Sequence, residues 1–145
     1  MNSFHQLMRN MSWRHDSAAG KLPRMTIFHS HQERSWRQIS PGVEFCYLRK
    51  HDDPAGPPGG LTFLVHMARG ADAQFHVHPG GEETYMVSGK LRVGEHHLVA
   101  GDYLWTPPGA AHDGHAEEES FFFIVAPGGL KATTRAGSEA RADLP

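Results

Sequence analysis

Four residues near the middle of the chain have side chains that commonly bind divalent metal ions. His76 and His78 are two residues apart in a strand-like segment, residues 75–78, so both imidazoles are expected on the same face. Glu82 opens the next predicted strand after a Pro-Gly-Gly turn, and antiparallel pairing would bring its carboxylate back over that face. His112 follows a second turn that is rich in Pro and Gly, and it is the candidate fourth ligand.

The types of these ligands narrow the choice of metal. Imidazole and carboxylate together suit Fe(II), Mn(II), Ni(II), Cu(II) or Zn(II), whereas Ca(II) and Mg(II) prefer oxygen ligands only. Glu83 competes with Glu82 for the carboxylate role, but strand alternation places Glu83 and Tyr85 on the opposite face. We therefore predict that His76, His78, Glu82 and His112 bind one divalent metal ion. We expect no other cofactor.

Two polar residues close to His112 have roles that the sequence leaves open. Asp113 and His115 could hydrogen-bond to the ligand imidazoles or carry protons, since a ligating imidazole usually donates its second N–H to an acceptor. Positions in a solvent-exposed loop fit these two residues equally well.

The elements that must position these ligands are predicted to be strands. Short apolar runs bounded by Gly, Pro and Asp recur after Gln38, where helical periodicity is hard to find, so the pattern indicates an all-β fold. Eight candidate strands would suit a jelly roll. They are residues 43–48, 61–68, 75–78, 83–87, 90–93, 97–99, 103–106 and 120–126.

Alternation along these strands assigns side chains to faces. The inner-face candidates for a mostly apolar cavity are Thr84, Met86, Phe63, Val65, Met67, Leu104, Phe121 and Phe123. The alternative for these side chains is packing in a plain core. Tyr103 and Trp105 would point away from the cavity, toward an outer sheet face or a dimer contact. Residues 121–125 are apolar on both faces, so we expect an N-terminal strand such as residues 26–28, or a second subunit, to cover the outer face.

The spacing of the candidate ligands is similar to the two sequence motifs of the cupin superfamily. The first motif is carried by Gly70, His76, His78, Glu82 and Gly89, and the second by Gly101, Pro107, Gly109 and His112. The second motif usually ends in Asn, and that place is taken here by His115, or by Ala116 if the spacing is shifted by one residue. The stretch between Gly89 and Gly101 is short, which predicts a bare hairpin.

The phrase from His78 to Glu83 resembles the cupin domains of ChrR-type anti-sigma factors and the acetylacetone-cleaving dioxygenases. This resemblance implies a double-stranded β-helix, the cupin or jelly-roll barrel, with a metal bound inside by residues that match the four candidates. It also implies a homodimer, which is common among cupins.

Two functions follow from the resemblance together with the site. The first is a non-haem Fe(II) dioxygenase for a small organic substrate such as a β-dicarbonyl or phenolic compound, with Glu82 as the catalytic residue that offsets the metal charge and moves protons. The alternative is a Zn(II)-binding module that senses a ligand or regulates a partner without catalysis. The regulator reading is weaker, because the segment before residue 38 is short for a sigma-binding domain and has no Cys.

Length and composition limit the partners. The chain has 145 residues with 14 Lys and Arg against 16 Asp and Glu, so a net charge of -2 disfavours nucleic acid and anionic lipid as partners and leaves small molecules. The longest apolar run, residues 121–126, is too short to span a membrane, and the N-terminus lacks a secretory signal, so we expect a cytoplasmic protein. We predict a mobile extension at residues 1–20, a single cupin domain at residues 21–130, and a flexible tail at residues 131–145.

Overall fold

A computed structural model describes residues 28–51 and 59–133 of the chain. Within these two ranges the chain forms one 3-10 helix of three residues, η1 (His31–Glu33), and eleven strands. No helix in the described part of the chain is long and apolar enough to cross a membrane.

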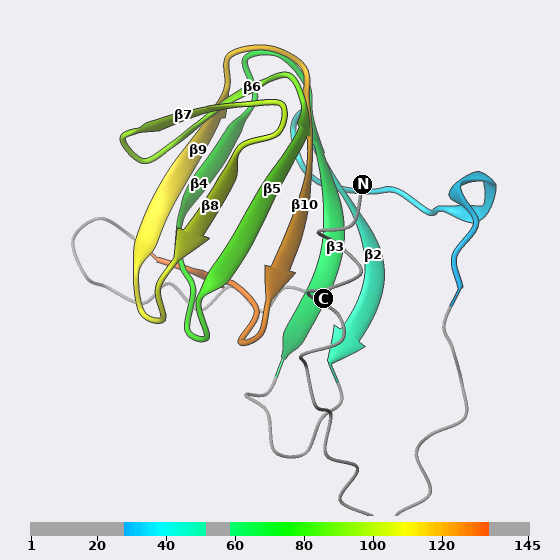
Figure 1. Cartoon of the computed structure of the whole chain (residues 1–145), viewed down its shortest axis with the longest axis horizontal. Helices are drawn as coiled ribbons and strands as arrows, with labels where there is room; N and C mark the ends of the chain where they lie inside the picture. Colours follow the sequence, from blue (N-terminus) through cyan, green and yellow to red (C-terminus); the bar gives the residue numbers. More distant parts are fainter. Residues whose placement is uncertain (1–27, 52–58, 134–145) are drawn as a thin grey trace, which may run out of the picture.

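The strands form two antiparallel sheets (Figure 1). The six-stranded sheet has the order β1-β2-β3-β10-β5-β8. Its strands are β1 (Arg37–Ser40), β2 (Val43–His51), β3 (Gly60–Met67), β10 (Ser120–Ala126), β5 (Glu82–Ser88) and β8 (Tyr103–Thr106). The five-stranded sheet has the order β11-β4-β9-β6-β7. Its strands are β11 (Lys131–Ala132), β4 (Asp72–Val77), β9 (Ala111–Ala116), β6 (Lys90–Val93) and β7 (His96–Val99).

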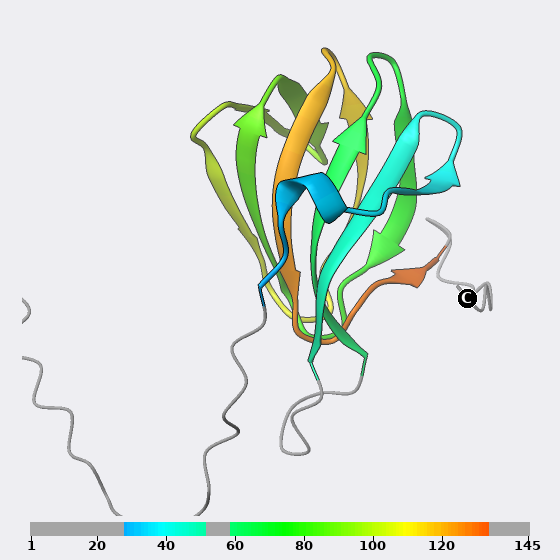
Figure 2. The ribbon, with the colours of Figure 1, turned by 90° about the vertical axis from the view of Figure 1, so that its right-hand side faces the viewer.

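The two sheets face each other and enclose the hydrophobic core (Figure 2). This arrangement confirms the predicted all-β jelly-roll fold, the double-stranded β-helix. The core side chains come from both sheets, with Phe63, Val65, Met86 and Phe122 from the larger sheet and Leu91 and Val93 from the smaller. Because a barrel strand buries one face only, alternate residues of each strand reach this core.

All eight predicted strands are present, with ends that differ by a few residues, and the predicted bare hairpin is β6 with β7. Three strands, β1, β9 and β11, were not predicted. Lys131 and Ala132, at the start of the predicted tail, form β11 on the edge of the smaller sheet. The predicted extension at residues 1–20, residues 26 and 27 of the proposed covering strand, and the tail from residue 134 lie outside the described residues.

Strand β5 alternates as predicted. Glu82, Thr84 and Met86 are buried between the sheets, while Glu83, Tyr85 and Val87 are exposed on the outside. The inward position of Glu82 rather than Glu83 is therefore confirmed.

The side chains of β10 that were predicted to face inward were wrong by one residue. Phe122 and Ile124 are buried in the core, whereas Phe121 is 36 % exposed and Phe123 shares its outward face. The run is apolar on both faces, so alternation alone could not choose between them, and a one-residue shift moves every side chain to the other face. For three other candidates, Phe63, Met86 and Leu104, the alternative of core packing holds, since they belong to or pack against the core and do not line the cavity.

Candidate metal centre

Three of the four predicted ligands form a compact histidine cluster. His76 on β4 lies opposite His112 on β9 in the pairing of these neighbouring strands, and His78 follows directly after β4. One ring nitrogen from each residue lies within 4.8 Å of those of the other two, so the three could hold one metal ion. The Nε2 atoms of His78 and His112 are 2.9 Å apart.

A β-bulge aims His76 into the barrel. Ala73 pairs with Gly114 and His76 with His112, so three steps along β4 match only two along β9. Ala73 and His76 are three residues apart, so in a regular strand they would face opposite sides. The extra residue of the bulge lets both face the same side.

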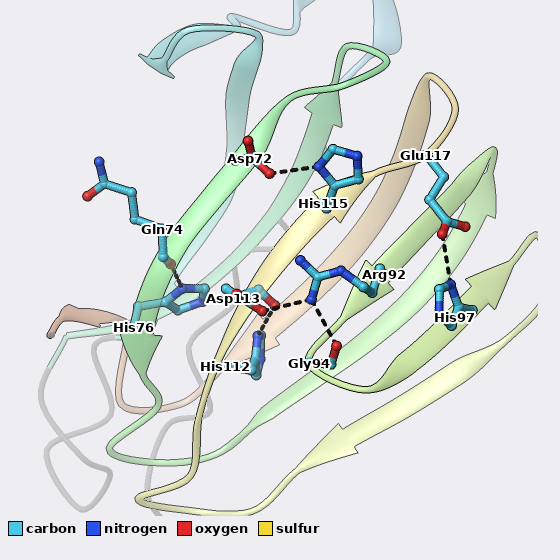
Figure 3. A network of polar contacts seen from close by, with 10 residues as sticks. All are labelled: Asp72, Gln74, His76, Arg92, Gly94, His97, His112, Asp113, His115 and Glu117. Carbon is cyan, nitrogen blue, oxygen red and sulfur yellow. Dashed lines mark hydrogen bonds and ion pairs between the residues drawn. The ribbon is translucent and has the colours of Figure 1, made fainter. Parts of the chain in front are cut away.

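The bulge also fixes the imidazole of His76. Its Nδ1 donates a hydrogen bond of 2.6 Å to the carbonyl oxygen of Gln74, which lies in the bulge (Figure 3). That bond leaves Nε2 as the nitrogen with a lone pair for a metal.

His112 is held in the same way by its own strand. Its Nδ1 donates to the carbonyl oxygen of Asp113 at 3.2 Å, again leaving Nε2 for a ligand (Figure 3). The Asp113 carboxylate is bound at 2.9 Å by Arg92, which also donates to the carbonyl oxygen of Gly94. Arg92 thus ties β6 and the β6–β7 turn to the backbone beside His112.

The predicted fourth ligand, Glu82, enters from the opposite sheet. Its side chain is 3 % exposed, with Oε1 at 3.7 Å from Nε2 of His112 and Oε2 at 3.2 Å from Nδ1 of His78. Oε1 accepts a hydrogen bond of 3.0 Å from the hydroxyl of Thr84. Glu82 is not part of the three-histidine cluster itself, and its role as a ligand stays a prediction.

Two buried polar atoms at this site have no hydrogen-bond partner among the described residues. They are Nδ1 of His78 and Oε2 of Glu82, which face each other. A buried carboxylate oxygen without a partner costs free energy unless a positive charge or a proton compensates it. The donor set and these two atoms therefore fit a bound divalent cation, which His76, His78 and His112 would hold together with Glu82.

Burial keeps the imidazoles in the form that binds metals. His78 is fully buried, and the loss of water lowers its pKa from the ordinary value of 6.5 to about 4. Burial also lowers the pKa of His76. Because the neutral imidazole is the ligand, both residues stay competent for metal binding at pH values where exposed histidines are protonated.

A cavity of about 270 Å³ adjoins the cluster. His76, His112, Glu82 and Thr84 line it, whereas His78 does not. The rest of the wall is largely apolar and comes from both sheets, and it includes Val65, Met67, Phe122 and Ile124. No Lys or Arg is among the described residues that line it.

The structure shows the positions of Asp113 and His115, whose roles the sequence left open. Asp113 contributes its backbone carbonyl to His112, and its carboxylate pairs with Arg92. His115 instead contacts Asp72 at 2.7 Å, away from His76 and His112 (Figure 3).

Sequence reasoning missed three residues that support the candidate ligands directly or through a neighbour. The Gln74 carbonyl depends on the bulge and Arg92 on strand pairing, and neither leaves a mark in the local sequence. Thr84 was placed on the inner face, and its position two residues after Glu82 was the available signal for a contact.

Comparison with known proteins agrees with this fold. An RmlC-like cupin protein from Ralstonia eutropha has 21 % identity and a TM-score of 0.65 over 77 % of this chain and 74 % of that chain. An acetylacetone dioxygenase from Acinetobacter johnsonii has 18 % identity and a TM-score of 0.65 over 83 % and 85 %. At these identities the likeness concerns the fold alone.

A third similar structure is the Rhodobacter sphaeroides complex of SigE with the anti-sigma factor ChrR. The match has 20 % identity and a TM-score of 0.57, over 67 % of this chain and 50 % of that chain. No curated protein matches the sequence. The family of ChrR cupin-like domains matches residues 24–131, most of the chain. The chain therefore belongs to the ChrR cupin-like domain family of the cupin superfamily.

Proposed function

We propose that the protein is a metal-dependent dioxygenase that acts on a small β-dicarbonyl or phenolic substrate, with Fe(II) as its metal. The observation that carries this proposal is the three-histidine cluster beside Glu82 at the wall of a small, largely apolar cavity. When bound there, a divalent iron would supply Lewis acidity toward substrate oxygens and redox chemistry with O2.

The cavity wall favours this class of substrate over carboxylic acids. No cationic side chain among the described residues lines the cavity, so no protein group there would pair with a permanent carboxylate. A β-dicarbonyl or a phenol enters as a neutral molecule and loses its proton only at the site. The apolar wall would pack against its carbon substituents and exclude water.

Glu82 is the residue that we propose to take this proton. Its Oε2 lies inside the barrel without a hydrogen-bond partner among the described residues, while Thr84 holds Oε1. A carboxylate fixed in this way can accept a proton from a neighbouring substrate.

Oxygen consumption tests the proposal. Protein purified without metal is loaded anaerobically with Fe(II) and mixed with a panel of β-diketones and catechols, and O2 uptake is recorded. We expect uptake with at least one compound for the Fe(II) form and none for the Zn(II) form. The variant His76→Ala is expected to lose both bound metal and O2 uptake, whereas the control His96→Ala, at an exposed position of strand β7, should keep both.

A second candidate function is supported by the family of the chain and by the similar structure of the SigE–ChrR complex. In this case the domain would bind Zn(II) and act as a sensing or regulatory module. Stoichiometric Zn in the purified protein, with no O2 uptake by the Fe(II) form toward any compound, would favour the module and count against the enzyme.

A further inference from the structure

The cavity beside the metal centre extends along the strands of the larger sheet. Its wall on this sheet has three levels, each two residues from the next. Ile124 pairs with Thr84 at the first level, Phe122 with Val65 at the second, and Met67 with Val43 at the third, and all of these residues line the cavity. Strand residues with this spacing share a face, so the three levels form one continuous wall.

The smaller sheet forms the opposite wall with a matching set of levels. His76 and His112, at the metal centre, pair with each other at the first level. At the second level Gly114 lies between Ala73 and Val93, and at the third level Leu91 follows on β6, two residues from Val93. These residues also line the cavity, which therefore runs between the two sheets from the metal centre to Leu91.

The third level closes the cavity. Val43, Met67 and Leu91 are exposed by only 3, 1 and 1 %. The β3–β4 turn joins the two walls here, since Ala116, the strand partner of Leu91, donates a hydrogen bond of 2.9 Å to the carbonyl oxygen of Ala71. In Figure 1 this is the end where β2 begins and β3 ends, opposite the β4–β5 and β8–β9 turns beside the metal centre.

The spacing of the levels gives the length of the cavity. Strands rise about 3.3 Å per residue, so two steps of two residues span roughly 13 Å. A dicarbonyl group of three C–C–C units beside the metal takes about 5 Å of this length, and an extended hydrocarbon chain advances roughly 1.3 Å per carbon. With about 2 Å for contact with the closed end, the rest holds a straight tail of about five carbons.

The wall along this length suits an apolar tail. The side chains at the second and third levels are hydrocarbon or thioether groups, and Gly114 and Ala73 leave room between the sheets. Besides the residues at the metal centre, Ser40 and Gln74 are the polar residues of the wall in the described part of the chain. Neither is buried, so they mark the side where the cavity reaches the surface.

We propose that the cavity binds a β-dicarbonyl with a straight apolar tail of about five carbons, whose tail ends against Val43, Met67 and Leu91. The inference rests on the proposed function and specifies its substrate. A volume of about 270 Å³ lies just below the common range for ligand cavities and agrees with a slender molecule of this size.

Calorimetric titration of the Zn(II) form with 2,4-alkanediones tests the proposal without turnover. The probes have straight tails from one carbon, in 2,4-pentanedione, to seven, in 2,4-undecanedione. We expect the dissociation constant to fall about 4-fold per added carbon up to about five, because each methylene group leaves water, and to rise for the longest tail. Zn content measured after each titration shows that the diketone has not removed the metal.

A dissociation constant that is independent of tail length would overturn the proposal. A steady fall up to the longest tail would also do so, since it would show that the cavity has no closed end at this distance from the metal.

Substitution of Val43 tests where the tail ends. Val43→Phe adds volume at the third level, so the best tail should be shorter by about two carbons, while 2,4-pentanedione should bind as before. Val43→Leu is a smaller change, to be used if the first variant does not fold by circular dichroism, and should shorten the best tail by about one carbon. The matched control is Val87→Phe, the same substitution at an exposed position of β5, and it should leave the series unchanged. An unchanged best tail in the folded Val43 variant, or a shift in the control, would overturn the proposal.

O2 uptake by the Fe(II) form separates this inference from the proposed function. A best tail length in the Zn(II) form without O2 uptake toward any diketone would support the ligand and reject the dioxygenase. O2 uptake together with a Zn(II) series that has no best tail length would keep the dioxygenase and overturn the inference.

Discussion

At the scale of single residues, the centre depends on which ring nitrogens its histidines leave free. The backbone carbonyls of Gln74 and Asp113 accept the Nδ1 protons of His76 and His112, so each ring presents Nε2 to the barrel interior. Backbone carbonyls hold both rings, and the charge of Asp113, next to His112, is paired with Arg92. The consequence is a site whose charge is set mainly by Glu82 and by the ion it would bind.

The hydroxyl of Thr84 is the contact that orients Glu82. We expect Thr84→Val to raise the dissociation constant of the bound metal by ~10-fold, because loss of a hydrogen bond to a ligating carboxylate typically weakens metal binding by this order. Competition with a chelator of known affinity measures the change. Thr62→Val, which removes a hydroxyl bonded to His51 on the six-stranded sheet, is the matched control and should leave metal affinity unchanged. Equal affinities for Thr84→Val and wild type would argue that Glu82 is not a ligand.

At the scale of elements, two turns meet at one backbone oxygen. The amides of Gly81, in the β4–β5 turn, and Gly109, in the β8–β9 turn, both donate to the carbonyl oxygen of His78, at 3.2 and 2.8 Å. Both glycines have positive φ, 79° and 82°. The two turns thereby hold the backbone of one ligand and lead directly to Glu82 and toward His112.

These two glycines form a matched pair for a stability experiment. A Cβ at Gly109 meets nothing within 4 Å, so Gly109→Ala should lower the free energy of unfolding only by the strain of its φ, about 1 kcal/mol. A Cβ at Gly81 would lie 3.0 Å from the carbonyl oxygen of Thr106 and 3.2 Å from Cδ of Pro108. We expect Gly81→Ala to cost about twice as much.

Denaturant unfolding of both variants measures the difference, and metal content provides a second measurement. Because Gly81 precedes Glu82, its substitution should also reduce metal retention, whereas Gly109→Ala should not. Equal losses of stability for both variants would show that the turn yields to the added methyl group.

Most of the strands could be predicted from the sequence, but the strand that carries His112 could not. The eight predicted strands are marked by β-branched, aromatic or other apolar residues between turn residues. β9 has the sequence Ala-His-Asp-Gly-His-Ala, which is poor in such residues, and pairing with β4 and β6 forms it. Tertiary context therefore decides this element.

The ligand histidines themselves could be predicted because their spacing is a local property. His76 and His78 share a face through strand alternation, and the Pro-Gly-Gly turn returns Glu82. The contacts around these residues could not be predicted, because they depend on pairing between strands that are distant in the sequence. The bulge in β4 and the Arg92–Asp113 pair are examples, since both arise only when β4, β9 and β6 lie side by side.

At the scale of the whole molecule, the buried histidines link stability to pH. His78 has its pKa lowered to about 4 in the fold, against 6.5 in the unfolded chain, so between these values the unfolded chain binds more protons. The metal-free protein should therefore lose stability as pH falls from 6.5 to about 4, by up to ~3 kcal/mol from this residue. Urea unfolding in the presence of a chelator, at several pH values in this range, measures the loss. His78→Asn should make the free energy of unfolding depend less on pH in this range. An equal slope for the wild type and the variant would contradict the assignment of this pH dependence to His78.

His66 provides a contrast on the outer face. Burial acts to lower its pKa, but hydrogen bonds to Glu44 and Glu119, both 2.9 Å long, outweigh this effect and raise it above 6.5. Its contribution to stability is thus fully present below pH 6.5 and is lost as pH rises through the raised pKa. His66→Gln should change how the free energy of unfolding depends on pH above 6.5. It should not change the loss of stability below pH 6.5, which is caused by His78.

The position of the ligands on two different layers has a mechanical consequence. His76 and His112 belong to the smaller sheet and Glu82 to the larger, and Glu82 and His112 are 30 residues apart in the chain. An ion that joined them would be a cross-link that closes this loop and restricts the unfolded chain. With Cys46 as its single cysteine, the chain has no internal disulfide to do so. The centre would then fasten the two halves of the barrel, as a disulfide fastens a small secreted domain.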